Sequence, residues 1–177
     1  MGRTDAAGAV ARAHEALDRA VRVLAEASAR TETLAEFDPG RRVLGIPRAP
    51  RMRVIAPVWR LGVLLLDADG RLYSTGRVVR AERAVRRSVL AESVAEHRAY
   101  RAAAVKGGIA EGETVVFDAV PLALDPEELA AGGGPLVLTD GAVVGVRWNP
   151  SFPDGAVPIE SYLAERVDLL VHPPQGA

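Results

Sequence analysis

The chain has 177 residues, of which 49% are hydrophobic and 25% charged, and it carries a formal net charge of −1 and no cysteine. This length and composition predict a soluble globular protein that buries its own core, and the lack of cysteine excludes disulfides, thiolate metal sites and cysteine nucleophiles. The longest purely aliphatic run, Val63 to Leu66, is far too short to span a bilayer. We find no segment typical of a secretory signal and expect a cytoplasmic protein.

Residues 6–34 are predicted to form one long amphipathic helix. Acid-first pairs four residues apart and ten alanines favour this helix. Its expected apolar stripe consists of Val10, His14, Leu17, Val21, Leu24 and Ser28. On that stripe, His14 is expected to be a packed histidine rather than a ligand. The helix is expected to pack on its own domain, with contact to a second subunit as the alternative.

Residues 39–57 are predicted to be an extended connector, because prolines at positions 39, 47, 50 and 57 disfavour a helix. A hairpin follows, with a strand from Trp59 to Leu66, a tight turn at 67–70 and a return strand over 71–75. Gly76 is expected to mark a bulge before a short extension over 77–79.

The second half of the chain is predicted to alternate helices and strands. We expect a helix over 83–106 that stops at Gly107-Gly108, and a strand over 114–120. A short helix begins at Asp125 as the N-cap with Pro126 after it, and glycines at 132–134 end it. A second hairpin over 136–148 and a last helix over about 159–171 complete the pattern.

These elements predict an α+β fold with a largely antiparallel sheet, built from two hairpins and one further strand and packed by the N-terminal, central and C-terminal helices. We expect a single domain over residues 1–177. Within it lie the N-terminal helix (1–38), the Pro/Arg-rich connector (39–57) and the α+β core (58–177).

Charge is sorted along the sequence. Residues 41–87 hold twelve arginines and three acids, whereas residues 88–177 hold thirteen acids and five bases. We expect the two segments to neutralise each other within the fold or across a dimer. The alternative is an anion site built by Arg60, Arg77 and Arg80 near the first hairpin.

One helical face could support chemistry. Ser93, His97, Tyr100 and Arg101 recur at spacings of three and four in the predicted central helix, and such a face could transfer protons or hold a carboxylate. A polar rim around a helix is the simpler interpretation. The candidate ligand-binding residues are therefore Arg60, Arg77, Arg80, His97, Tyr100 and Arg101.

Other motifs do not fit a known chemistry. The turn at 67–70 has its glycine at the fourth position rather than the sixth position of a calcium loop, and the glycines at 132–134 follow a helix instead of opening one. The histidines at 14, 97 and 172 have no partner at metal-ligand spacing. No Gly-x-Ser-x-Gly elbow and no Ser-x-x-Lys pair is present. We predict no metal and no cofactor, assign no catalytic residue and expect neither membrane nor nucleic-acid binding.

Several segments resemble a family of small proteins of high-GC bacteria, and a high-GC genome also fits the use of 21 arginines with one lysine. The matching segments are 59–66, 70–76, 107–108, 111–115 and 161–166. Some members carry the label glutaminase, which implies amide hydrolysis. Serine-type glutaminases need Ser-x-x-Lys and amidotransferase types need a cysteine, so the motifs here do not support the label.

Two hypotheses about function follow. The first is a non-catalytic binding domain that forms a homodimer through its amphipathic helices. The second is an amide- or carboxylate-processing enzyme with an arginine-lined site for a small anion, formed around Arg60, Arg77, His97 and Arg101.

Overall fold

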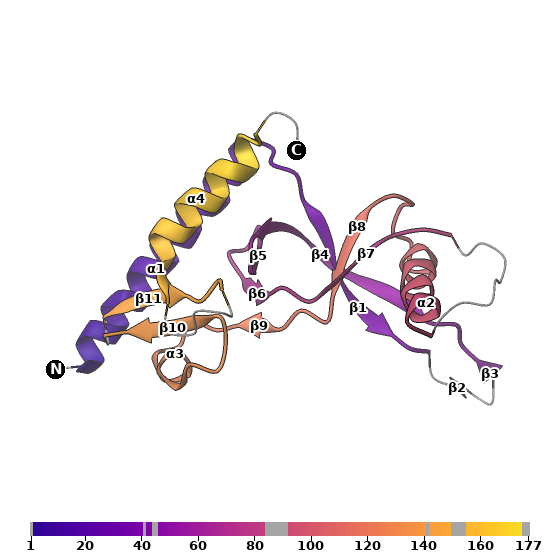
Figure 1. Ribbon diagram of the computed structural model, residues 1–177, viewed down its shortest axis with the longest axis horizontal. Coiled ribbons are helices and arrows are strands. Elements are labelled where there is room, and N and C mark those ends of the chain that lie inside the picture. Colours follow the sequence, from indigo (N-terminus) through magenta and orange to yellow (C-terminus); the bar gives the residue numbers. More distant parts are fainter. Residues whose placement is uncertain are drawn as a thin grey trace. The chain divides into compact units, whose positions relative to one another are not determined.

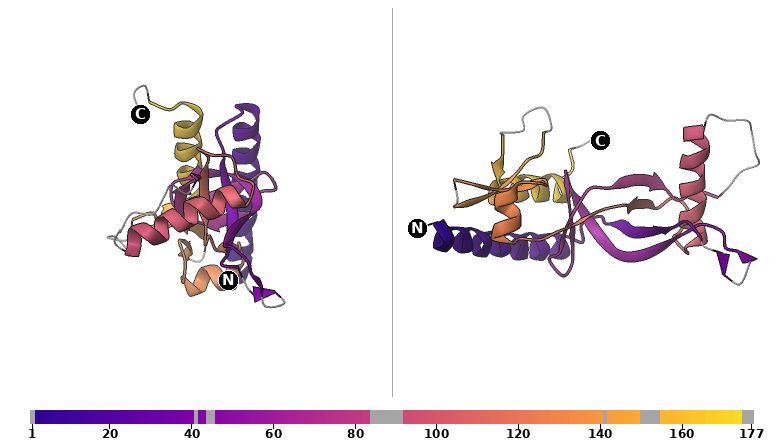
Figure 2. Two further views of the ribbon diagram at one scale, coloured as in Figure 1. Left: turned by 90° about the vertical axis from the view of Figure 1, so that its right-hand side faces the viewer. Right: turned by 90° about the horizontal axis from the view of Figure 1, so that it is seen from below.

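The computed structural model describes residues 2–40, 42–43, 46–83, 92–140, 142–149 and 155–174. Within this part of the chain, four helices accompany strands that are mostly antiparallel, so the predicted α+β class is confirmed (Figures 1 and 2). No helix in the described residues is long and apolar enough to cross a membrane.

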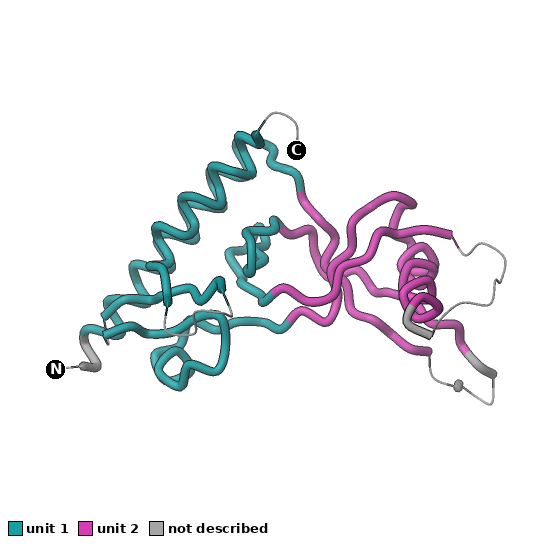
Figure 3. The backbone as a smooth tube through the Cα atoms, in the orientation of Figure 1, with its two compact units in different colours: residues 1–30, 59–74, 120–177 teal, residues 31–58, 75–119 magenta. Residues whose placement is uncertain are grey.

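The chain forms two compact units (Figure 3). Unit 1 comprises residues 1–30, 59–74 and 120–177, and unit 2 comprises residues 31–58 and 75–119. Strand β4 (Arg51–Leu61) begins in unit 2 and ends in unit 1. Two compact units can belong to a single folding domain, so the expected single domain stays a prediction.

Unit 1 contains three of the four helices found in the described residues. Its elements are α1 (Gly2–Glu26), the end of β4 (Arg51–Leu61), β5 (Leu64–Asp67), β6 (Leu72–Ser74), β9 (Pro121–Leu122), α3 (Pro126–Ala131), β10 (Leu136–Thr139), β11 (Val143–Val146), β12 (Val157–Pro158) and α4 (Ile159–Val171). Strands β5, β6 and β9 pair antiparallel in that order, as do β10, β11 and β12. Helices α1 and α4 pack side by side and run in the same direction (Figures 1 and 2).

Unit 2 is a mixed sheet with one helix. Its elements are β1 (Glu32–Asp38), β2 (Arg42–Val43), β3 (Ile46–Pro47), most of β4, β7 (Arg77–Arg80), α2 (Glu92–Lys106) and β8 (Thr114–Phe117). The strand order is β7-β8-β1-β4, in which β1 and β8 are parallel and the other neighbours antiparallel. Buried residues of α2, including Ala103 and Ala104, share a core with Val115 and Phe117 of β8.

The predicted N-terminal helix is too long, because α1 ends at Glu26 and residues 32–38 form β1. Ser28 adopts a left-handed conformation with φ 50°, and the Ala29 amide donates to the Leu24 carbonyl, an arrangement that closes a helix C-terminus. The buried face also differs from the predicted stripe. It consists mainly of alanines with Leu17 and Leu24, whereas His14 is exposed.

The predicted connector over 39–57 is also wrong, since it contains β2, β3 and most of the eleven-residue strand β4. Pro57 lies within β4 opposite Thr33 of β1. A proline is tolerated in a strand where the ladder does not need its missing N–H. This segment forms a strand because it pairs with β1, a contact that local propensity does not predict.

The strand predicted from Trp59 to Leu66 is interrupted by a turn at Gly62-Val63. Gly62 has φ 64°, and a Cβ at this position would overlap the Tyr162 hydroxyl. That hydroxyl donates to the Leu61 carbonyl and accepts from the Val63 amide, each at 2.9 Å. Tyr162 of α4 therefore holds the β4–β5 turn.

Most of the remaining predictions are confirmed. The turn after β5, the second hairpin and α4 lie where expected. Asp125 caps α3 by accepting from the amides of Glu127 and Glu128, and Gly132 ends the helix with φ 66°. The strand expected over 114–120 is shorter, since β8 stops at Phe117. Residues 84–91 of the predicted central helix lie outside the described residues, and Val94 of α2 is 42% exposed.

Candidate functional site

The six candidate ligand-binding residues do not form one group. Arg60 lies half-buried on the unit 1 part of β4, whereas the other five belong to unit 2. Arg77 and Tyr100 contact each other. Arg80 donates from Nε to the Gly112 carbonyl at 3.0 Å, and His97 is exposed on α2.

Arg77 lies in a compact aromatic and acidic cluster. Its guanidinium donates to the Tyr100 hydroxyl at 2.6 Å and to Glu96 at 3.3 Å, and lies 4.6 Å from the centre of the Tyr100 ring. Tyr100 in turn donates to Glu96 Oε1 at 2.6 Å. Its ring packs between Phe37 and Phe117, with ring centres 4.9 Å and 4.8 Å away.

The electrostatics of this cluster are internally balanced. The hydrogen bond from Tyr100, followed by that from Arg77, lowers the pKa of Glu96 below its ordinary value. The hydrogen bond to Glu96 raises the pKa of Tyr100, and the same carboxylate raises the pKa of Arg77. The cation at Arg77 is thus already compensated by a carboxylate of its own unit.

Arg101 is likewise engaged, because its guanidinium pairs with Glu82. The Ser93 side chain lies outside the described residues. The predicted helical face therefore presents Tyr100 and Arg101 to acids of unit 2 and leaves His97 in solvent. Anion binding by any of these residues stays a prediction.

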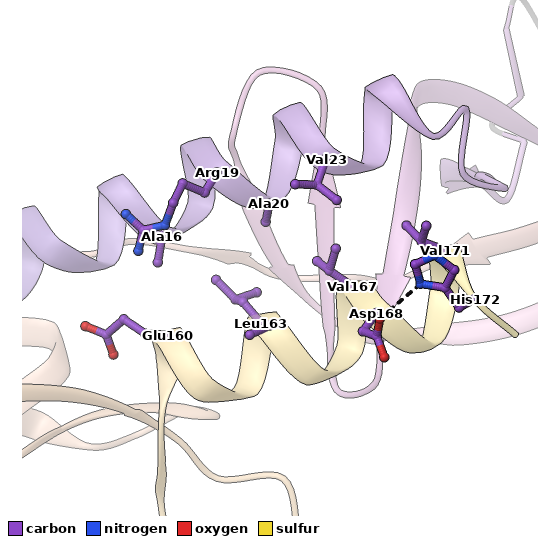
Figure 4. A pocket seen from close by; sticks show the side chains of 11 residues that line it. Ala16, Arg19, Ala20, Val23, Glu160, Leu163, Val167, Asp168, Val171 and His172 are labelled. Atoms are coloured by element: carbon purple, nitrogen blue, oxygen red, sulfur yellow. Dashed lines mark hydrogen bonds and ion pairs between the residues drawn. The ribbon is translucent and has the colours of Figure 1, made fainter.

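A different feature stands out in unit 1, a groove between α1 and α4 that the sequence did not indicate. The volume of this α1–α4 groove is about 330 Å³. Its lining residues are Ala16, Arg19, Ala20, Val23, Glu160, Leu163, Ala164, Val167, Asp168, Val171 and His172 (Figure 4). Because α1 and α4 are parallel, both helices contribute to it along most of the length of α4.

Small side chains explain why the two helices leave a groove. Ala16 and Ala20 are one turn apart on α1 and fill little space against Leu163 and Val167 of α4. The alanine-rich composition of α1 was visible in the sequence. Whether these alanines leave a groove depends on which face of α1 packs against α4, and this is set by the tertiary structure.

Charged residues lie at both ends of the groove (Figure 4). Arg19 and Glu160 lie at one end, and neither side chain forms an ion pair with another described residue. At the other end, His172 Nδ1 lies 3.0 Å from Asp168 Oδ1. The groove therefore has an aliphatic centre with a basic and an acidic group at each end.

Neither a metal centre nor a related protein identifies the site. Among the described residues, no three histidine, aspartate or glutamate side chains could hold a metal ion. Comparison with protein-family models, curated proteins and solved structures found no match. The resemblance to small proteins of high-GC bacteria stays a prediction.

Proposed function

We propose that this protein is a non-catalytic binding domain that self-associates through the α1–α4 groove. The single observation that carries the proposal is the groove itself, an aliphatic surface with charged ends. Val23, which lines the groove, is 45% exposed. Apolar side chains exposed around a groove favour association with another surface.

The charge arrangement favours a second copy as the occupant. A two-fold axis through the middle of the groove would place opposite ends against each other. The end of the groove with Arg19 and Glu160 in one copy would then face the end with Asp168 and His172 in the second copy. Such a surface is self-complementary in sign, as an isologous interface requires.

The size of the surface predicts a weak dimer. Two adjacent helices are about 20 Å wide, and a helix of the length of α4 is about 20 Å long, which gives a face of about 400 Å². Stable complexes bury about 800 Å² per partner. We therefore propose a dimer whose population depends strongly on protein concentration.

Sedimentation velocity tests this proposal across concentrations from about 10 μM to about 500 μM. The average mass is expected to rise above the 18.7 kDa of one chain toward twice that value. Val23→Glu should keep the protein monomeric, because it places a charge on the apolar surface. Val94→Glu is the matched control, since Val94 is a similarly exposed helical valine in unit 2.

Charge reversal provides a sharper test of the arrangement. Arg19→Glu and Asp168→Arg should each weaken the dimer by placing like charges opposite each other, and the double variant should restore it. A monomer at every concentration would reject the proposal, as would a dimer that Val23→Glu does not change. The alternative function, an amide- or carboxylate-processing enzyme, stays a prediction. Two of its candidate anion-binding residues, Arg77 and Arg101, are already paired with acids.

A further inference from the structure

Unit 1 contains a second cavity, separate from the α1–α4 groove, which we call the His14 hollow. Its volume is about 620 Å³, within the range of about 300–1,000 Å³ that is typical of small-molecule sites. Four segments line it: residues 14, 17 and 18 of α1, residues 69–73 around β6, residues 121–124 around β9, and Glu128 of α3.

Aliphatic side chains form part of the surface of the hollow. Leu17 and Leu72 are almost fully buried and belong to the unit 1 core, and Leu122 and Leu124 pack against that core. A ligand in the hollow would therefore contact hydrocarbon as well as polar groups. This favours an organic molecule over a hydrated inorganic ion.

One wall of the hollow is held in place by a buried carboxylate. Asp67 is the one buried charged residue of the described chain, with 3% exposure. It accepts from the amides of Asp69 and Arg71 at 2.9 Å and 2.8 Å, and from the Tyr73 hydroxyl at 3.2 Å. Burial, followed by the charge of Asp67, raises the pKa of Tyr73. The turn that leads into β6 is thus preorganised.

The hollow is lined by three carboxylates, one guanidinium and the imidazole of His14, so with a neutral imidazole its charge is negative. Arg71 pairs with Asp69 at 2.7 Å and lies 3.7 Å from Asp67, so its cation is compensated. Asp18 on α1 and Glu128 on α3 also line the hollow, and within the described residues neither carboxylate forms an ion pair. Two carboxylates on different elements therefore remain available, with leucines in the same cavity.

We propose that the His14 hollow binds an alkyl diammonium compound, with one ammonium group near Asp18 and the other near Glu128. The hydrocarbon between the two cations would cover the leucines. A bare metal ion does not fit, because no three ligating side chains of the described residues come together. The proposal rests on unit 1 alone and is independent of self-association.

Isothermal titration calorimetry tests the proposal with 1,4-diaminobutane, with butylamine and with succinate. The diamine is expected to bind the wild-type protein more tightly than butylamine, because the monoamine can satisfy one carboxylate only. Succinate is not expected to bind. Asp18→Asn and Glu128→Gln should each weaken diamine binding by about tenfold, the scale of one charge-assisted hydrogen bond.

Two neighbouring acids outside the hollow serve as matched controls. Glu15→Gln lies on α1 and Glu127→Gln on α3, and both remove the same charge without touching the cavity. Circular dichroism verifies that all four variants fold. The proposal is overturned if the diamine does not bind, if succinate binds instead, or if the controls weaken binding as much as Asp18→Asn and Glu128→Gln.

Discussion

The two units differ in how their charged side chains are paired. Unit 2 places five of its arginines beside acids of the same unit, in the pairs Arg51–Asp38, Arg53–Glu36, Arg77–Glu96, Arg83–Glu111 and Arg101–Glu82. Unit 1 has a core of alanine and aliphatic side chains, and several charges at its two cavities form no ion pair in the described chain. Ion-paired side chains are typical of a structural role. Charged side chains that line a cavity without an ion-pair partner favour the binding of a ligand or another protein.

The hydrophobic cores of the two units also differ in the side chains that they bury. In unit 2, Phe117 is fully buried and contacts the rings of Phe37 and Tyr100, so one aromatic residue joins the sheet to α2. In unit 1, four alanines of α1 share the core with larger side chains that include Leu61, Leu64 and Leu66. Truncation of Phe117 should therefore cost more stability than removal of the methyl group of one of these alanines.

The largest expected effect is that of Phe117→Ala, which should lower the free energy of unfolding by about 4 kcal/mol through the cavity it leaves. Ala13→Gly in unit 1 is the comparison, with an expected loss of about 1 kcal/mol from helix propensity. Urea unfolding measures both. Equal losses would contradict the expected difference between Phe117 and Ala13.

A smaller effect is expected at the turn between β4 and β5. Tyr162→Phe removes a buried hydroxyl that bonds both Leu61 and Val63, and should cost about 2 kcal/mol in the free energy of unfolding. Tyr100→Phe removes a hydroxyl at the surface of unit 2 and should cost less, because solvent replaces its bonds. A larger loss in the free energy of unfolding for Tyr100→Phe than for Tyr162→Phe would contradict this prediction.

The smallest expected effect concerns pH and the Arg77 cluster. Because folding lowers the pKa of Glu96, its contribution to stability is present above its ordinary pKa of 4.5 and is lost as the pH falls through the lowered value. Glu96→Gln should therefore reduce the change in melting temperature between about pH 5 and pH 3. Melting curves that change with pH to the same extent in both proteins would contradict this assignment.

Local sequence signals predicted elements that local physics controls. The cap at Asp125, the turn at 67–70 and helix α4 were all visible, because capping, turn chemistry and apolar periodicity act within a few residues. The β1 and β4 strands were missed, because alanine content and prolines argued against them. Their pairing is a non-local contact that propensity does not encode.

The candidate sites show the same division. The sequence indicated Arg77 and Tyr100 as polar residues of interest, yet the acids that compensate Arg77 come from α2 and from the turn after β8. The α1–α4 groove and the His14 hollow combine residues from segments far apart in the chain. No local pattern could have joined Ala16 to Leu163, or Asp18 to Glu128.

The α+β class, the helix ends marked by caps and glycines, and the separation of basic from acidic segments can all be read from the amino-acid sequence. Which arginines are neutralised and which cavities remain became clear from the three-dimensional fold alone. Helix capping, turns and amphipathic periodicity are short-range effects. Charge compensation and the shape of a cavity depend on which distant segments pack together.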